Sequence, residues 1–281
     1  EGDGISGLII DYYDKNWVIQ AHSTGVFLQM EQIAEAIKSN FPNYCETIYC
    51  KSSGTLPNTG TDYFLFGNKA EAVAKENNIL FSVNWVEGQK TGFFLDQREN
   101  RKLLGEFSKG KKVLNTFCYT GGFSIYAMSA GAELVTSVDI SQKAVDLAAS
   151  NMELNFPNAN HKAVADDVFN FMKEHTQQYD VIVLDPPAFA KSIKSKHTAT
   201  QAYKRLNIAG LKALAPNGIL FTFSCSQVID DVLFYNTVAA AAIETGRNIR
   251  VLHKLEQGPD HPTNIYHPEG HYLKGLVLFV E

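Results

Sequence analysis

The chain has 281 residues, of which 45% are hydrophobic and 20% charged, and its formal net charge at pH 7 is -5. This is the composition of an ordinary soluble globular protein, long enough for one large or two average domains with a sizeable core. The acidic balance argues against a nucleic-acid-binding face over the whole surface, although it leaves room for a local basic patch.

The sequence contains no signal for export, membrane insertion or metal binding. No stretch approaches about 20 uninterrupted apolar residues and no basic-then-apolar leader is visible, so we expect a cytoplasmic protein without a membrane partner. The first residue is Glu1 rather than methionine, which indicates a piece of a longer or processed protein. The cysteines form no C-x-x-C pair and no zinc-like cluster with histidine, so neither a metal site nor a disulfide framework is expected. They are Cys45, Cys50, Cys118 and Cys225.

Residues 1–88 are expected to form a small α+β domain. Residues 7–22 alternate apolar and polar side chains around a turn, which predicts a hairpin, and residues 31–39 have the spacing of an amphipathic helix. Strand-like runs follow at residues 63–66 and 79–86. A helix mixed with antiparallel strands is typical of α+β folds.

From about residue 110 the pattern changes to alternating apolar strands and amphipathic helices. This alternation predicts an α/β fold, a doubly wound parallel sheet, and we assign residues 89–281 to this second domain. After a helix at residues 228–245, strands at 249–255 and 272–279 are expected to add an antiparallel edge. The parallel strands are expected at residues 113–117, 134–139, 161–165, 181–185 and 219–224, with helices from Gly122, Ser141, Val168 and about Thr200.

The ends of the first three parallel strands each carry a plausible ligand contact. The first leads through C-Y-T-G-G into a helix, where glycines permit a tight turn and close backbone approach to a ligand. The G-x-G-x-x-G fingerprint of a pyrophosphate site is absent, which favours a nucleoside without phosphates. Asp139 ends the second strand, where it can accept ribose hydroxyls or cap the next helix. Ser141 could supply that cap instead, which frees Asp139 for the ligand. At the third strand end, Asp166 or Asp167 can meet an adenine amino group and Val168 can pack on the ring.

The fourth strand ends in D-P-P-A-F, which is typical of an active-site lip. Pro186 and Pro187 fix φ and remove backbone donors, so the strand must end there. The turn then holds Asp185 and Phe189 rigidly, and a carboxylate beside an aromatic ring suits a planar substrate such as a nucleobase. The same pattern is also typical of a buried strand followed by a proline-ended loop.

Cys225 follows the fifth strand, in F-S-C-S. By residue type alone, a buried core cysteine is equally expected. Because neighbouring parallel strands share one crevice at their carboxyl ends, however, Cys225 and Asp185 should face the same ligand. Cys118 sits in the turn after the first strand and is the weaker candidate for a reactive thiol.

Several segments resemble the class I S-adenosylmethionine-dependent RNA methyltransferases, in particular the bacterial large-subunit 23S rRNA cytosine-5 methyltransferase family. The similarity spans essentially the whole chain and implies a Rossmann-like fold, S-adenosylmethionine as cofactor and RNA as partner. Family members usually carry an N-terminal RNA-binding PUA domain, for which this chain has no room, and often a lysine where Ala188 stands. The segments are NTFCYTGGFS, VTSVDIS, ADDVF, VIVLDPPAF, LFTFSCS and KTGFFLDQR.

The resemblance implies roles for individual residues. Phe94 and Gln97 would close over the cofactor, although a linker packed on the sheet is the alternative for both. Phe117, Tyr119 and Gly121 would line its amino-acid end. The complete set of expected cofactor contacts is Phe94, Gln97, Phe117, Tyr119, Gly121, Asp139, Asp167, Val168 and Asp185.

The implied chemistry needs a cysteine nucleophile. A thiolate that adds to C6 of cytosine activates C5 for methylation and leaves at the end of the cycle, which is the role predicted for Cys225. Asp185 is expected to hydrogen-bond the N3/N4 edge of the ring. The thiol must be partly ionised near neutral pH, which a neighbouring cation or helix N-terminus could achieve. The sequence does not identify the base that removes the C5 proton.

Residues 191–205 carry six basic groups, counting His197, and no acid. Together with the small domain, this segment is a candidate for gripping RNA in a loop or bulge, since a paired base would have to be extruded. A solvated loop and helix start is the alternative, and both a monomer and a homodimer remain open. The expected substrate contacts are Pro186, Pro187, Phe189, Lys191 and Arg205.

Two other functions are consistent with the sequence. An Asp-Pro-Pro-aromatic lip also occurs in enzymes that methylate the exocyclic amines of adenine N6 or guanine N2, which need no nucleophile. A non-catalytic RNA-binding protein that retains a cofactor pocket is the alternative from a different class. A small-molecule methyltransferase is the weakest candidate, because it would leave the first domain and F-S-C-S without a role.

Overall fold

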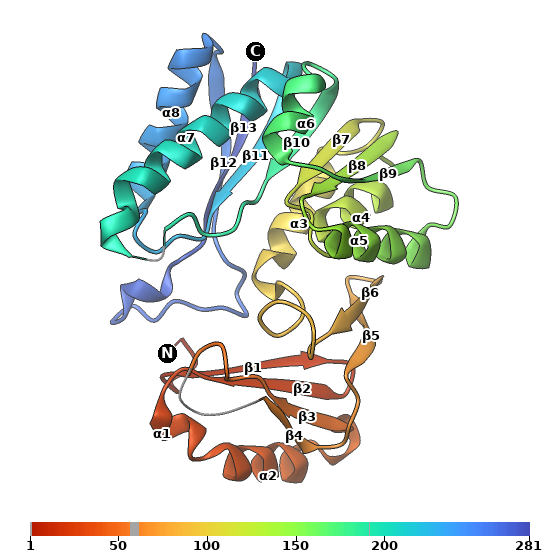
Figure 1. Ribbon diagram of the computed structural model, residues 1–281, viewed down its shortest axis with the longest axis vertical. Coiled ribbons are helices and arrows are strands. Elements are labelled where there is room, and N and C mark those ends of the chain that lie inside the picture. Colours follow the sequence, from red (N-terminus) through yellow and green to blue (C-terminus); the bar gives the residue numbers. More distant parts are fainter. Residues whose placement is uncertain (1, 57–61, 191) are drawn as a thin grey trace. The chain divides into compact units, whose positions relative to one another are not determined.

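The computed structural model describes residues 2–56, 62–190 and 192–281. Its contacts divide the chain into two compact units (Figure 1). The boundary predicted after residue 88 falls a few residues before the observed division, and the return of a late segment to the first unit was not predicted. The roles of the two domains stay predictions. The first unit contains Glu1–Leu95 and Pro262–Gly270, and the second contains Asp96–His261 and His271–Glu281.

The first unit is built on a sheet of order β1-β2-β3-β4. The predicted hairpin consists of β1 (Leu8–Tyr13) and β2 (Asn16–Ala21). Its turn residues Asp14 and Lys15 have φ of 41° and 68°, the left-handed pair that a type I′ turn requires. This turn fixes the register of the hairpin, in which β2 is buried along most of its length.

A helical crossover joins β2 to its parallel neighbour β3 (Thr47–Cys50). Parallel strands need such a connection, and α1 (Thr24–Phe27) and α2 (Met30–Asn40) provide it, with the short η1 (Pro42–Tyr44) after them. The remaining strands are β4 (Tyr63–Phe66), antiparallel to β3, and a separate pair, β5 (Glu71–Glu76) and β6 (Ile79–Asn84). The core of this unit contains Ile19, Ala21, Met30, Ala34, Ile37, Ile48 and Cys50.

The second unit contains the predicted doubly wound sheet, in the order β12-β13-β11-β10-β7-β8-β9. The strands from β11 to β9 are parallel, and β13 and β12 add the predicted antiparallel edge. The order of the parallel strands reverses between β7 and β10, which makes a ligand-binding crevice at their carboxyl ends. The strands are β7 (Lys112–Thr116), β8 (Leu134–Asp139), β9 (His161–Ala165), β10 (Tyr179–Leu184), β11 (Leu214–Ser224), β12 (Ile249–Leu255) and β13 (Lys274–Val280).

Helices cover both faces of this sheet (Figure 1). On one face lie α3 (Arg98–Glu106), α4 (Gly122–Ser129) and α5 (Gln142–Asn155). The other face carries α6 (Val168–Glu174), α7 (Lys196–Ala213) and α8 (Asp231–Thr245). The short helices η2 (Leu95–Gln97), η3 (Ile193–Ser195) and η4 (Pro268–Gly270) lie in connections.

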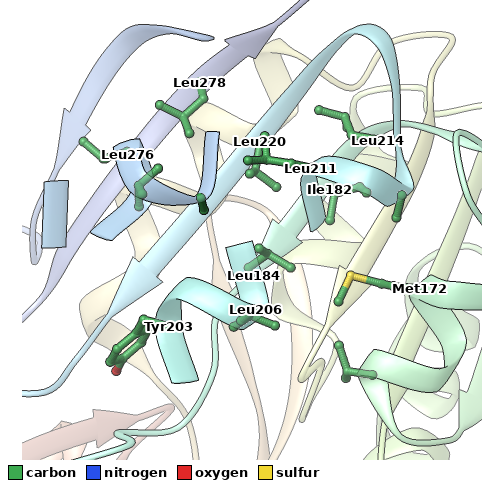
Figure 2. Close-up of a cluster of buried hydrophobic side chains, with 14 of the residues drawn as sticks. Met172, Ile182, Leu184, Tyr203, Leu206, Leu211, Leu214, Leu220, Leu276 and Leu278 are labelled. Atoms are coloured by element: carbon green, nitrogen blue, oxygen red, sulfur yellow. The ribbon is translucent and has the colours of Figure 1, made fainter. Parts of the chain in front are cut away.

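The main core fills the space between the sheet and α6, α7 and α8 (Figure 2). Leu184 of β10 and Leu206 of α7 are fully buried there, and each such leucine contributes about 2 kcal/mol of burial free energy. A Cβ atom on Gly210 would lie 2.7 Å from Leu184 Cδ1, so glycine lets α7 approach the strand closely. This packing holds the ends of β10 and β11 in fixed positions.

Candidate active site

The ends of β10 and β11 bring Asp185 and Cys225 to one edge of the sheet. The two strands are parallel neighbours, with Leu184 opposite Thr222, so the residues that follow them emerge together. Cys225 Sγ lies 3.9 Å from the carbonyl oxygen of Pro186, toward which it donates. The two residues that strand-end reasoning paired are therefore neighbours.

A pocket of about 250 Å³ opens beside Cys225. Cys225 is partly exposed, whereas Cys118 is almost completely buried. The pocket is smaller than the clefts that hold drug-sized ligands, so it offers room for one small ring. Its lining consists of Ala188, Ala190, Cys225, Gln227, Val228 and Tyr272.

Hydrogen bonds fix the orientation of the Asp185 carboxylate. Gln97 Nε2 donates to Asp185 Oδ1 at 3.1 Å. Asn100 Nδ2 in turn donates to Gln97 Oε1 at 2.7 Å, which determines how the Gln97 amide is turned. Asn100 had no predicted role, because an asparagine inside a polar helix gives no signal in the sequence.

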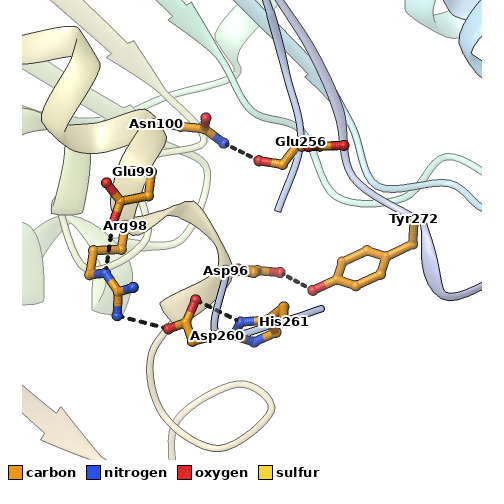
Figure 3. A network of polar contacts seen from close by, with 8 residues as sticks. All are labelled: Asp96, Arg98, Glu99, Asn100, Glu256, Asp260, His261 and Tyr272. Carbon is orange, nitrogen blue, oxygen red and sulfur yellow. Dashed lines mark hydrogen bonds and ion pairs between the residues drawn. The ribbon is translucent and has the colours of Figure 1, made fainter. Parts of the chain in front are cut away.

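Further polar contacts tie the segment around Gln97 to the end of the chain (Figure 3). The Tyr272 hydroxyl donates to Asp96 Oδ2 at 2.7 Å, and Arg98 Nη1 pairs with Asp260 Oδ2 at 2.8 Å. Asn100 Nδ2 also donates to the carbonyl oxygen of Glu256 at 3.2 Å. These contacts tie Tyr272, a pocket residue, to Asp96, which directly precedes Gln97.

The proline lip is tied to the end of β11 through buried side chains. Phe189 packs against Tyr203 of α7, with ring centroids 4.7 Å apart, and adjoins the hydrophobic core. The Tyr203 hydroxyl lies 2.9 Å from Ser226 Oγ, which also accepts from the Ala190 amide. Of the two prolines, Pro186 is buried and Pro187 is exposed. Phe189 thus has a packing role in addition to the substrate contact predicted for it.

The structure places one of the two predicted basic contacts, Arg205, well inside α7 rather than at the strand ends. Arg205 is exposed in the middle of α7, nine residues after its first residue and so about 13 Å along the helix axis. Lys191 lies outside the described residues. Both substrate contacts stay predictions.

The turn from β7 to α4 adopts a conformation that few residues favour. Phe117 and Tyr119 have φ of 53° and 44°, and Gly121, the N-cap of α4, has φ of 77°. Non-glycine residues in this left-handed region are strained, and such strain concentrates at functional sites. The turn is anchored to the end of β8, because the Cys118 amide donates to the Val138 carbonyl at 3.1 Å.

Asp139, the last residue of β8, accepts hydrogen bonds from this turn and from the start of α5. Its Oδ2 accepts from the Tyr119 amide at 3.1 Å, and its Oδ1 accepts from the Ser141 amide at 3.0 Å. Ser141 Oγ caps α5 by accepting from the Ala144 amide, as the sequence predicted. Asp139 is half-buried, and each of its oxygens has capacity for a further donor.

At the end of β9, Asp167 has a structural role that was not predicted. Its Oδ1 accepts from the amides of Phe169 and Asn170, so it caps α6. Val168 is buried in the main core. An adenine contact for either residue stays a prediction.

The sequence model of the S-adenosylmethionine-dependent methyltransferases matches residues 57–276 of this chain. The chain belongs to this family. The sequence is also 40% identical over 287 residues to ribosomal RNA large subunit methyltransferase I of Aeromonas hydrophila, in an alignment that covers 99% of this chain and 72% of the relative.

Solved structures agree with this assignment. A Streptococcus mutans protein assigned as an S-adenosylmethionine-dependent methyltransferase matches with a TM-score of 0.86 and 27% identity, over 99% of this chain and 73% of that one. A methyltransferase solved with S-adenosylhomocysteine matches equally well, with a TM-score of 0.86, 28% identity and the same coverage. The Rossmann-like fold predicted for this methyltransferase is confirmed.

The cofactor of the family is S-adenosylmethionine, which supplies an electrophilic methyl group. The second unit has a suitable site for its nucleoside part, because a half-buried carboxylate with free acceptor capacity suits a ribose diol. The left-handed turn from Phe117 to Gly121 brings backbone close to that carboxylate. Phe94 lies in the first unit, where Lys90 Nζ is 4.8 Å from its ring centroid, and its cofactor contact stays a prediction.

In the part of this methyltransferase that the structure describes, every helix is too short or too polar to span a bilayer. The same residues contain no group of three or more histidine, cysteine or acidic side chains placed to hold a metal ion.

Proposed function

We propose that this methyltransferase acts on RNA and forms 5-methylcytosine in 23S ribosomal RNA through a covalent adduct with Cys225. The name of the Aeromonas relative supports large-subunit ribosomal RNA as the substrate. The observation that favours carbon over nitrogen as the methyl acceptor is Cys225, whose thiol borders the pocket and lies 3.9 Å from the carbonyl oxygen of Pro186. An enzyme that methylates an exocyclic amine has no use for a thiol there.

The chemistry follows from the low nucleophilicity of cytosine C5. The Cys225 thiolate adds to C6, and the ring electrons displaced from the C5=C6 bond become available at C5. Asp185 hydrogen-bonds the N3/N4 edge and stabilises the protonated ring of the covalent adduct. C5 then takes the methyl group as the S–CH3 bond breaks, and the sulfonium sulfur leaves as a neutral thioether. A base removes the C5 proton, and the electron pair of that C–H bond restores the C5=C6 bond while the C6–S bond breaks and releases the thiolate.

The environments of the other cysteines support this choice. Burial raises the pKa of the Cys118 thiol strongly, and the Asp139 carboxylate raises it further. Burial also raises the pKa of Cys45 and Cys50, which belong to the first unit. A thiol with a raised pKa is a poor nucleophile near neutral pH.

A second function remains a candidate because of the proline lip. Asp185, fixed by Gln97, could accept a hydrogen bond from the exocyclic amine of adenine or guanine while that nitrogen attacks the methyl group. This reaction needs no covalent adduct. Cys225 therefore discriminates between the two functions.

We expect Cys225→Ala to lower methyl transfer to ribosomal RNA by at least about a thousandfold, because the nucleophile is lost. Transfer is measured with radiolabelled cofactor on 23S RNA lacking the modification. Calorimetry should show unchanged S-adenosylmethionine binding, since the cofactor turn is on other strands. Cys45→Ala, in the first unit, is the matched control and should retain activity.

RNA that contains 5-fluorocytosine provides an independent measurement. Fluorine at C5 prevents proton removal, so the wild-type protein should accumulate a denaturation-resistant complex and Cys225→Ala should not. If Cys225→Ala retains methylation and no complex forms, the covalent mechanism is wrong and the amine reaction takes its place.

A further inference from the structure

Lys274 is a buried lysine at the first position of β13, and the residue is only 3% exposed. Its Nζ donates to the carbonyl oxygens of Tyr272 at 2.7 Å and Ser226 at 3.3 Å. Both acceptors are neutral, so they solvate the ammonium without neutralising it. A buried ammonium of this kind is costly unless an anion lies nearby.

The acids nearest to Lys274 are engaged elsewhere and lie in solvent. Asp230 pairs with Lys196 and has a side chain 62% exposed, and Asp231 pairs with His271 and has a side chain 68% exposed. Solvent screens their attraction for a buried charge. Burial lowers the pKa of Lys274, whereas the charges of Asp231, Cys225 and Asp230 act in the opposite direction. Cys225 is the member of this set that lies inside the site.

The strand register explains why Lys274 lies next to the segment that carries Cys225. Lys274 pairs with Ser224 in the antiparallel ladder of β11 and β13, and its ammonium reaches the carbonyl of Ser226. The lysine thus contacts the chain on both sides of Cys225. Tyr272, its other acceptor, lines the same pocket as Cys225.

We propose that Lys274 is a positioning residue for the reaction and that its ammonium stabilises the thiolate form of Cys225. This inference rests on the proposed function of Cys225. The thiolate is both the attacking group and the leaving group of the cycle, so a fixed cation favours its formation and its release. Among the described residues, the other titratable groups around Cys225 are Asp185 after β10, Tyr203 of α7, Tyr272 before β13, and Asp230 and Asp231 at the start of α8.

The pH dependence of Cys225 alkylation tests this role in the full chain without RNA. Iodoacetamide labelling at each cysteine is followed by mass spectrometry from pH 6 to pH 10. The wild-type midpoint should lie below about 8.5, the usual value for a free thiol. Lys274→Met should raise the midpoint by about one unit, which lowers the labelling rate at pH 7 about tenfold and leaves the rate near pH 10 unchanged.

Two variants serve as controls. Lys274→Arg keeps the charge and should keep the low midpoint of Cys225 alkylation. If the role of Lys274 were only structural, Lys274→Met and Lys274→Arg would both shift that midpoint. Lys254→Met removes an exposed charge from the neighbouring strand β12 and should leave Cys225 labelling unchanged. Thermal melting and calorimetric S-adenosylmethionine binding report whether each variant is folded.

An unchanged Cys225 midpoint in folded Lys274→Met overturns the inference. If that variant does not fold, a wild-type midpoint at or above about 8.5 has the same consequence, because the thiolate is then not stabilised. Retained methylation in Cys225→Ala would instead refute the proposed function, while the alkylation profile would still report the coupling between Lys274 and Cys225. The two failures are therefore distinguishable.

Discussion

At the scale of single residues, the amide of Gln97 controls how Asp185 presents its carboxylate. Since Asn100 donates to Gln97 Oε1, the Nε2 group must face Asp185 Oδ1. Reacting groups lose much of their effectiveness when they are misplaced by about an ångström. With Oδ1 fixed by Gln97, the carboxylate of Asp185 faces a base in a defined direction.

We expect Gln97→Leu to lower kcat about 10- to 100-fold, because the carboxylate loses its fixed donor. Steady-state methylation with varied S-adenosylmethionine separates kcat from KM. Gln201→Leu, at an exposed position of α7, is the control and should have no effect. A raised KM for S-adenosylmethionine with unchanged kcat would mean that Gln97 acts as the cofactor contact implied by the family resemblance instead.

The sequence predicted that Asp185 and Cys225 lie at one edge of the sheet, because both follow buried strands and parallel strands end at one edge. It could not identify Lys274 in this way. A single lysine before G-L-V-L-F-V is typical of a solvated strand start, and its burial depends on pairing with a strand far earlier in the chain. Asp167 was assigned to adenine because a strand-end acid can bind a ligand or cap a helix, and only the structure reveals that it caps α6.

At the scale of elements, a buried polar chain joins β7, α4, β8 and β9. Asn115 Nδ2 donates to Ser124 Oγ at 2.9 Å, Ser124 Oγ lies 2.6 Å from Ser137 Oγ, and Ser137 Oγ lies 2.8 Å from His161 Nε2. Burial lowers the pKa of His161 from 6.5 to about 4. The native protein therefore holds this imidazole neutral under mildly acidic conditions.

This lowered pKa predicts that the protein loses stability in acid over a defined pH range. Between pH 6.5 and about 4 the unfolded chain binds a proton at His161 that the native protein does not, so stability falls as the pH falls through that window. Above pH 6.5 His161 contributes no pH dependence. We expect the wild-type free energy of unfolding to fall by about 1 to 2 kcal/mol more than that of His161→Gln between pH 7 and pH 5.

Urea denaturation followed by circular dichroism measures this difference. Tryptophan fluorescence is unsuitable, because Trp17 and Trp85 both belong to the first unit. His253→Gln, at an exposed position of β12, is the control and should keep the wild-type pH dependence. Equal pH dependence in the wild type and His161→Gln would contradict the prediction.

Periodicity predicted the elements with clear apolar faces and missed those without them. The buried residues of α3 are Asn100, Arg101 and Leu104, so no apolar stripe marks this helix. Strand β3 has only four residues and is buried along its whole length, which leaves no alternation to detect. Strand β11 begins at Leu214 rather than 219, because the A-P-N-G stretch that is typical of a turn is included in the strand.

At the scale of the whole molecule, the net charge of -5 requires that any RNA-binding surface be a local basic patch. Part of the basic segment is already neutralised, since Lys196 pairs with Asp230 at 3.5 Å and Lys204 pairs with Glu244 at 2.6 Å. Lys194 and Arg205 are exposed and form no ion pair with a described residue. Among the described lysines and arginines of this segment, they are the ones that remain available to meet phosphates.

We expect Lys194→Ala and Arg205→Ala each to weaken binding to a 23S RNA fragment and to reduce the salt dependence of affinity by about 0.7 in the log–log slope, the value for one contact to single-stranded RNA. Titrations at several salt concentrations measure this slope. Lys162→Ala, exposed on β9 at the far edge of the sheet, is the control. An unchanged slope for a variant removes that residue from the RNA contact surface.

The position of β13 has a consequence for the synthesis of the protein. This strand lies between β11 and β12 in the sheet but is synthesised after both. Residues 262–270, which precede it, belong to the first unit. Until residues 274–280 emerge from the ribosome, β11 and β12 lack their shared partner, and Lys274 is missing from the Cys225 pocket. A nascent chain can therefore complete its cofactor turn long before it can complete the site around its thiol.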